Sequence, residues 1–243
     1  MLKIVKFLKD FLLFLPITRI FQPVAKGFRF LFYFNQLNIW VHRHKGQLLY
    51  SDFYSPIRNY EKRYQLYDFV AGHFSLTSNK MIYLEFGVAS AASFKWWLKR
   101  NEHPESFFAG FDTFEGLPEE WGGFFEKGAM SATLPELADP RATFRKGLFQ
   151  DTLTTFIQKH LDILRDEETI RVIHLDADLY SSTAFTLSQL YPYLQKGDVI
   201  LFDEFNVALH EFKAYQEFVS NFYIRLKPIA AVNNFYQTAF VVE

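Results

Sequence analysis

Short apolar runs alternate with segments of helical periodicity from Met81 to the end of the chain. Segments with one apolar face, which predict helices, lie at 89–100, 151–165, 180–195 and 208–223. Alternation of this kind indicates parallel strands joined by right-handed crossovers. The apolar runs that predict the strands are 81–86, 107–112, 142–146, 170–176, 198–203, 229–232 and 235–242.

The last two predicted strands depart from the parallel order. They flank Asn233-Asn234, a dipeptide that tolerates the positive φ of a tight turn, and so predict an antiparallel hairpin. We therefore expect an α/β fold of Rossmann-like type, with a doubly wound, mostly parallel sheet of seven strands that ends in this hairpin.

The first 45 residues differ from the rest of the chain in charge. They carry eight Lys or Arg residues against one acid, a net charge of +7, whereas the remainder carries −8. We expect residues 1–45 to be an extension outside a catalytic domain of residues 46–243.

Residues 2–15 predict a basic amphipathic helix within this extension, which Pro16 would end. Lys3, Lys6 and Lys9 share one face, and mostly Phe, Leu and Ile occupy the others. Such a helix can make peripheral contact with an anionic membrane, or it can pack on the body or on a partner subunit in a homo-oligomer. The sequence leaves these alternatives open.

Composition excludes several classes of protein. The chain of 243 residues has no cysteine, which rules out disulfides, thiolate zinc sites and a cysteine nucleophile. No window has the roughly 18 consecutive apolar residues of a membrane span, and the early apolar run lacks a signal-peptide cleavage site. The acidic body carries no nucleic-acid footprint. We expect a cytoplasmic protein, and its 30 phenylalanines predict an aromatic core.

Acidic residues end several of the predicted strands. Ligands of such sheets bind at the carboxyl ends of the strands, so these acids should converge on one crevice. Local capping of the turns is the alternative role for each of them. The acids are Glu85, Asp112, Asp176 and Asp203.

Two neighbouring strand ends carry acidic pairs, Asp176 with Asp178 and Asp203 with Glu204. Carboxylates so close together repel one another unless a cation neutralises them or they share protons. Oxygen ligands of this kind suit Mg²⁺. His174, inside the apolar strand, is expected to be a hydrogen-bonded core residue rather than a ligand or base.

The turn after the first predicted strand indicates a second binding site. Gly87 would let the backbone approach a ligand, and Asp112 could accept hydrogen bonds from ribose hydroxyls. A full G-x-G-x-x-G is absent because alanines stand at Ala89, Ala91 and Ala92, which disfavours a dinucleotide.

Five segments, YLEFGVAS, FDTFEGLPEEW, KGLFQDTL, HLDADLYSST and LFDEF, resemble in order and spacing the macrocin O-methyltransferase family. The resemblance runs from about Tyr83 to Phe218 and implies a class I, S-adenosylmethionine-dependent, metal-assisted enzyme that methylates a hydroxyl of a sugar or similar small acceptor. Methyltransferases of this architecture close their sheet with a hairpin. Two departures stand out: Ala91-Ala92 replaces paired glycines, and Asp203-Glu204-Phe205 replaces Asp-Asp-Tyr.

The resemblance also implies roles for individual residues. Asp178 would be the base, although Asp176 and Asp178 could exchange roles. The Mg²⁺ ligands would be Asp176, Asp203 and Glu204, and the S-adenosylmethionine site would comprise Glu85, Gly87, Val88, Asp112, Gln150 and Asp151. The acceptor pocket would be shaped by residues 50–74 and 113–140.

Two rival functions fit parts of the sequence. Asp176-Ala177-Asp178 after an apolar strand is also how metal-dependent glycosyltransferases bind a nucleotide sugar, but these enzymes need no Glu-Phe-Gly turn. A non-catalytic membrane-surface protein on the same scaffold would explain the basic helix but not the acids.

Overall fold

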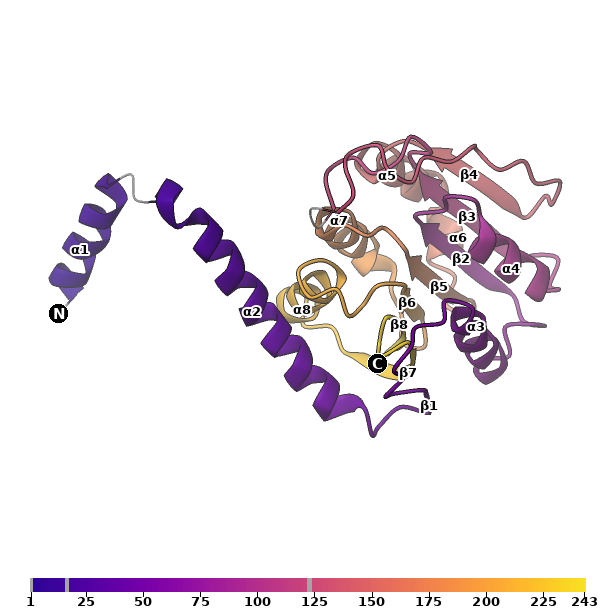
Figure 1. Ribbon diagram of the computed structural model, residues 1–243. Coiled ribbons are helices and arrows are strands. Elements are labelled where there is room, and N and C mark those ends of the chain that lie inside the picture. The colour runs from indigo at the N-terminus through magenta and orange to yellow at the C-terminus, as the bar shows by residue number, and fades with distance from the viewer. Residues whose placement is uncertain (1, 16–17, 122–123) are drawn as a thin grey trace.

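The computed structural model describes residues 2–15, 18–121 and 124–243 of the chain. Eight strands form one sheet in the order β1-β7-β8-β6-β5-β2-β3-β4 (Figure 1). All neighbouring strands are parallel except β8, which runs antiparallel to both β6 and β7. The strands are β1 Tyr50–Ser51, β2 Met81–Phe86, β3 Phe107–Asp112, β4 Ala142–Lys146, β5 Ile170–Leu175, β6 Val199–Phe202, β7 Leu226–Val232 and β8 Gln237–Val242.

Helices cover both faces of the sheet. Helices α5, α7 and α8 and the last turns of α2 pack on one face, and α3 and α4 pack on the other. The helices are α1 Leu2–Phe14, α2 Thr18–His44, α3 Lys62–His73, α4 Ala92–Arg100, α5 Phe149–Lys159, α6 Leu161–Leu164, α7 Tyr180–Leu190 and α8 Glu211–Asn221. A 3-10 turn at Tyr191–Tyr193 directly follows α7.

The predicted fold class is confirmed, including the antiparallel pair formed by the last two strands of the chain, β7 and β8. The structure adds an eighth strand, β1, whose two residues are too few to show a period in the sequence. It also divides the helix predicted at 151–165 into α5 and α6 at His160. Helix α3 lies in a segment for which the sequence predicted no element.

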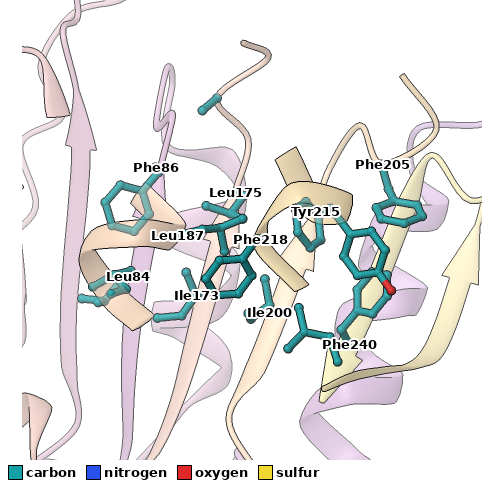
Figure 2. Packing of buried hydrophobic residues seen from close by; sticks show 14 of the residues in the cluster. Leu84, Phe86, Ile173, Leu175, Leu187, Ile200, Phe205, Tyr215, Phe218 and Phe240 are labelled. Carbon is teal, nitrogen blue, oxygen red and sulfur yellow. The ribbon is translucent and has the colours of Figure 1, made fainter. Parts of the chain in front are cut away.

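The aromatic core predicted from composition is present. Strand β2 is buried along its whole length because parallel strands covered on both faces meet no water. Side chains of α7 and α8, among them Leu187, Tyr215 and Phe218, lie against Ile173, Leu175 and Ile200 of the sheet (Figure 2). The phenylalanines are not all in this core, since many on α1 and α2 are exposed.

The end of α2 docks on the body. Leu37, Trp40 and Val41 are buried in the core, and the Trp40 indole donates a hydrogen bond to the Tyr215 hydroxyl at 3.2 Å. Helix α1 matches the helix predicted at 2–15 and has no buried residue, while Pro16, its predicted end, lies outside the described residues. Among the described helices, none combines the length and apolarity needed to cross a bilayer.

A buried ion pair locks the amino ends of β5 and β6 together. The Arg171 guanidinium donates to Asp198 at 2.7 Å, and both side chains are almost fully buried. The same guanidinium donates to the carbonyls of Leu164 and Asp166, which ties α6 to the sheet. These bonds satisfy a charge that would otherwise be costly to bury.

We expect Arg171→Met to lower the free energy of unfolding by about 3–5 kcal/mol, because Asp198 would stay buried without its partner. The double variant Arg171→Met/Asp198→Leu should recover most of that loss, since no unpaired charge remains. Urea denaturation of both variants tests this. A double variant as unstable as the single one would show that packing rather than charge is responsible.

Candidate active site

A cavity of about 480 Å³ opens at the carboxyl ends of β2, β3, β5 and β6. The sequence predicted the strand-end acids at this edge of the sheet. The structure brings residues predicted for the cofactor site and residues predicted for the metal and base to one wall. The predicted residues that line it are Gly87, Asp112, Gln150, Asp176, Asp178, Asp203 and Glu204.

Gly87 makes the tight turn between β2 and α4. Its φ is +94°, and a Cβ built there would lie 1.8 Å from the carbonyl oxygen of Asp176. The end of β5 therefore approaches this turn more closely than any side chain permits. Ala89 and Ala91 also adopt positive φ, 45° and 61°. The two alanines thus take the left-handed conformation that glycines at these positions would adopt more readily.

Asp112, at the end of β3, organises this turn. Its Oδ2 accepts the backbone N–H groups of Val88 and Ala89, both at 2.8 Å. Its Oδ1 accepts the N–H of Phe114 at 2.7 Å. A carboxylate offers about four acceptor positions, so one remains for a ligand hydroxyl.

Three predicted cofactor residues do not line the cavity. The Glu85 side chain is buried against the sheet, where it accepts the Tyr83 hydroxyl and lies 3.6 Å from Nδ1 of His174. Val88 is buried and contributes only its backbone to the turn. Asp151 is exposed on the first turn of α5. Their roles in cofactor binding stay predictions.

The four acids after β5 and β6 share one electrostatic environment. Burial and the charge of Asp203 raise the pKa of Asp176 well above its usual range. Burial and the charge of Asp178 raise the pKa of Glu204 to about 10. For Asp203, burial is outweighed by His174 and Arg63, which hold its pKa below the usual value. Burial and mutual repulsion thus disfavour the fully charged form of this cluster.

Asp203 and Glu204, the two acids after β6, are each held by a partner at one carboxylate oxygen, and the other oxygen makes no hydrogen bond within the described part of the chain. Asp203 Oδ2 pairs with the Arg63 guanidinium at 3.1 Å, and Glu204 Oε1 accepts the Tyr236 hydroxyl. Asp203 Oδ1 and Glu204 Oε2 are buried and accept no hydrogen bond from any residue the structure describes, although Nε2 of His174 lies 3.9 Å from Asp203 Oδ1. Two buried carboxylate oxygens without a hydrogen bond, beside Asp176 and Asp178, are a donor set that fits a hard divalent cation.

His174 lies close enough to Asp176 and Asp203 for the three to offer atoms within 4.8 Å of one another. However, the imidazole is held by the hydroxyls of Tyr83 at 2.7 Å and Tyr67 at 3.3 Å. Burial opposes its charged form, but the carboxylates of Asp203 and Glu85 outweigh burial and raise the pKa of His174 to about 10. Both ring nitrogens are already directed at tyrosine hydroxyls, so His174 is better placed to balance the charge of the acids than to ligate a metal.

Sequence reasoning missed several residues that line this wall or support it from behind. Glu211, the first residue of α8, accepts the backbone N–H of Glu204 at 2.9 Å and so fixes the turn after β6. Tyr60 and Arg63 come from a segment without a recognisable motif. The sequence does contain a feature connected with this segment, Asn233-Asn234, but on its own that dipeptide predicts only a turn.

Those two asparagines also hold the segment that carries Tyr60 and Arg63. The backbone N–H of Ser55 donates to Asn234 at 2.8 Å, and that of Asn59 donates to Asn233 at 2.9 Å. Their side-chain amides return hydrogen bonds to the carbonyls of the same two residues. The hairpin turn thus places one side of the cavity.

The loop after β3 forms the opposite side. It folds back on itself at Gly116, where a Cβ would lie 2.3 Å from the carbonyl oxygen of Gly128. This fold brings Leu117 and Met130 to the cavity wall. The Ser181 hydroxyl also donates to Glu119 at 2.6 Å, which ties the loop to the start of α7.

The family model described as Macrocin-O-methyltransferase (TylF) matches residues 131–237, which include all four clustered acids but not Gly87 or Asp112. A curated relative, demethyldecarbamoylnovobiocin O-methyltransferase of Streptomyces niveus, is 34% identical over 70 residues. That match spans 29% of this chain and 23% of the relative. The family resemblance expected from the sequence is thereby confirmed.

Solved structures show the same fold. CalS11, a calicheamicin methyltransferase, superposes with a TM-score of 0.54 at 18% identity, over 86% of this chain and 91% of its own. The O-methyltransferase NovP superposes with a TM-score of 0.51 at 18% identity, over 75% of this chain and 78% of its own.

We expect Gly87→Ala to lower the free energy of unfolding by at least about 2 kcal/mol, because the new methyl group meets backbone and the positive φ is strained. Gly72→Ala, in α3 with open space around it, is the matched control and should be neutral or stabilising. Thermal and urea unfolding measure both. Equal stability of the two variants would contradict the close approach of the β2 turn to β5.

Proposed function

We propose that this protein, whose residues 131–237 match the macrocin O-methyltransferase family, transfers a methyl group from S-adenosylmethionine to a hydroxyl of a small acceptor such as a sugar. The observation that carries the proposal is that the turn at Gly87 and the four clustered acids line the same cavity. Fold alone would leave the activity undecided, whereas residues suited to a methyl donor and residues suited to activating a hydroxyl, in one cavity, support this activity.

The cofactor would lie over the ends of β2 and β3. Asp112 has one acceptor position free for a ribose hydroxyl, and Gln150 offers an amide at the cavity wall. Leu148 and Phe149, which line the same side, provide apolar surface for the adenine ring. The reactive methyl group would then point toward the acids of β5 and β6.

The acceptor hydroxyl would lie beside those acids. Asp176, Asp203 and Glu204 would hold Mg²⁺, which lowers the pKa of a bound hydroxyl and orients it. Asp178 takes the proton, or Asp176 does so if the two exchange roles. Burial raises the pKa of Asp178, which makes it a stronger base than an exposed carboxylate. S-adenosylmethionine, when bound, would supply the methyl group: its carbon–sulfur bond would break as the new carbon–oxygen bond forms, and S-adenosylhomocysteine would leave.

The substrate class follows from the relatives as well as from the site. CalS11 is described as a TDP-rhamnose 3′-O-methyltransferase, and the curated relative methylates a novobiocin precursor by its name. A sugar hydroxyl is a weak acid, so it needs the activation that clustered carboxylates and a cation provide. Tyr60, Arg63 and Tyr236 on the cavity wall offer aromatic and hydrogen-bonding surface for such an acceptor.

The rival functions explain less of the cavity. A metal-dependent glycosyltransferase would use Asp176-Ala177-Asp178 but has no need for Gly87 and Asp112 on the same wall. A non-catalytic protein has no use for buried, unpartnered carboxylate oxygens, which are costly to keep.

We expect the protein to bind S-adenosylhomocysteine, and Asp112→Ala to weaken that binding by about 1.5–3 kcal/mol, the usual loss for a charge-assisted hydrogen bond. Isothermal calorimetry measures the affinities, and thermal unfolding separates binding from loss of the Gly87 turn. Asp162→Ala, an exposed acid on α6, is the control. No binding to the native chain, or equal binding to both variants, would refute the cofactor site.

We expect activity to require Mg²⁺, so that excess chelator abolishes turnover and added Mg²⁺ restores it. Asp178→Asn should lower kcat by about 100-fold or more, as loss of a general base does. Release of S-adenosylhomocysteine from a panel of sugar nucleotides, including TDP-rhamnose, measures both effects. Asp162→Asn should leave kcat unchanged. Full activity in chelator would exclude the metal from the reaction.

A further inference from the structure

Helix α1 and residues 18–32 of α2 form an arm that extends from the body (Figure 1). Every large apolar side chain of α1 is exposed, and Phe14 is exposed to 82% of its surface. Monomeric proteins rarely leave contiguous apolar surface of this size in water. Apolar surface of this extent usually marks an interaction site.

Helix α2 carries two apolar faces. One face, with Leu37, Trp40 and Val41, packs on the body. At about 100° per residue, a second stripe lies on the opposite side and is exposed. Its members are Phe21, Val24, Phe28, Leu31, Phe32 and Ile39.

Charge accompanies this apolar surface. On α1 the exposed Lys3, Lys6 and Lys9 occupy one face, and the apolar side chains occupy the rest of the circumference. Residues 1–45 together carry a net charge of +7, which would repel the same segment of a second copy. A broad apolar face bordered by lysines is the pattern of a helix that lies in the surface of an anionic bilayer.

We propose that the arm is a peripheral membrane anchor whose partner is an anionic lipid surface. The lysines pair with lipid phosphates, while the phenylalanines and leucines enter the boundary between headgroups and acyl chains. This proposal does not depend on methyl transfer and stands or fails separately from it.

The direction of α2 relates the anchor to the cavity. The Tyr33 hydroxyl donates to Glu217 of α8 at 3.4 Å, and Glu217 also accepts the hydroxyl of Tyr180, the first residue of α7. Tyr180 follows Asp178 by two residues, so α2 leaves the body on the side of the sheet where the cavity lies. A bilayer bound by the arm would therefore lie near the cavity edge of the sheet.

Flotation of the full-length protein with vesicles tests the proposal. We expect binding to vesicles of phosphatidylglycerol and phosphatidylcholine and little binding to pure phosphatidylcholine. Each lysine contributes roughly fivefold, so Lys3→Gln/Lys6→Gln/Lys9→Gln should bind about 100-fold more weakly. The matched control replaces three exposed lysines of the body with the same change in net charge, as Lys99→Gln/Lys127→Gln/Lys196→Gln, and should bind as the native chain does.

Apolar variants test the other half of the interaction. Phe7→Ser/Phe11→Ser should lose vesicle binding, whereas Tyr223→Ser, at an aromatic residue of the body that is even more exposed, should keep it. Light scattering in the absence of vesicles tests the alternative that a second copy of the chain covers the arm. Binding that ignores lipid charge, lysine variants equal to their control, or a stable dimer that Phe7→Ser/Phe11→Ser dissociates would overturn the proposal.

Discussion

Electrostatic repulsion among four acids at the ends of two neighbouring strands is the constraint on which this cavity depends. The backbone N–H of Asp203 bonds to the carbonyl of Leu175 at 2.9 Å, so the register of β5 and β6 forces the two acidic turns together. The Arg63 guanidinium, 3.1 Å from Asp203, offsets part of the charge, and Nε2 of His174 lies 3.9 Å from the same carboxylate. The buried oxygens left without partners indicate where further positive charge belongs.

The donor side of the cavity is coupled to this cluster by backbone contact. Gly87 lies against the carbonyl of Asp176, so the turn proposed to hold the cofactor and the strand end proposed to activate the acceptor touch directly. Asp112 fixes the other end of the same turn through the backbone N–H groups of Val88 and Ala89. The sheet itself thus sets the spacing between the two proposed sites, and a fixed spacing is what the short, aligned approach of methyl transfer would require.

The sequence predicted the sheet and its acidic edge because both follow from local periodicity and the strand-end rule. It missed Arg63 and Glu211 because their positions depend on contacts between distant segments. Glu85 was expected at the crevice, but its side chain projects from the face of β2, paired in register with His174. Helix α2 escaped prediction because two apolar stripes on opposite sides blur a single helical period, and β1 is too short to show one.

A crystal grown with Mn²⁺ and S-adenosylhomocysteine tests the central claim most directly, because manganese scatters anomalously and accepts the oxygen ligands that suit Mg²⁺. We expect one anomalous peak among the carboxylates of Asp176, Asp203 and Glu204, with His174 bonded only to its tyrosines and flanking carboxylates. Absence of a peak there at saturating Mn²⁺, or a metal bound directly to the His174 imidazole, would contradict it.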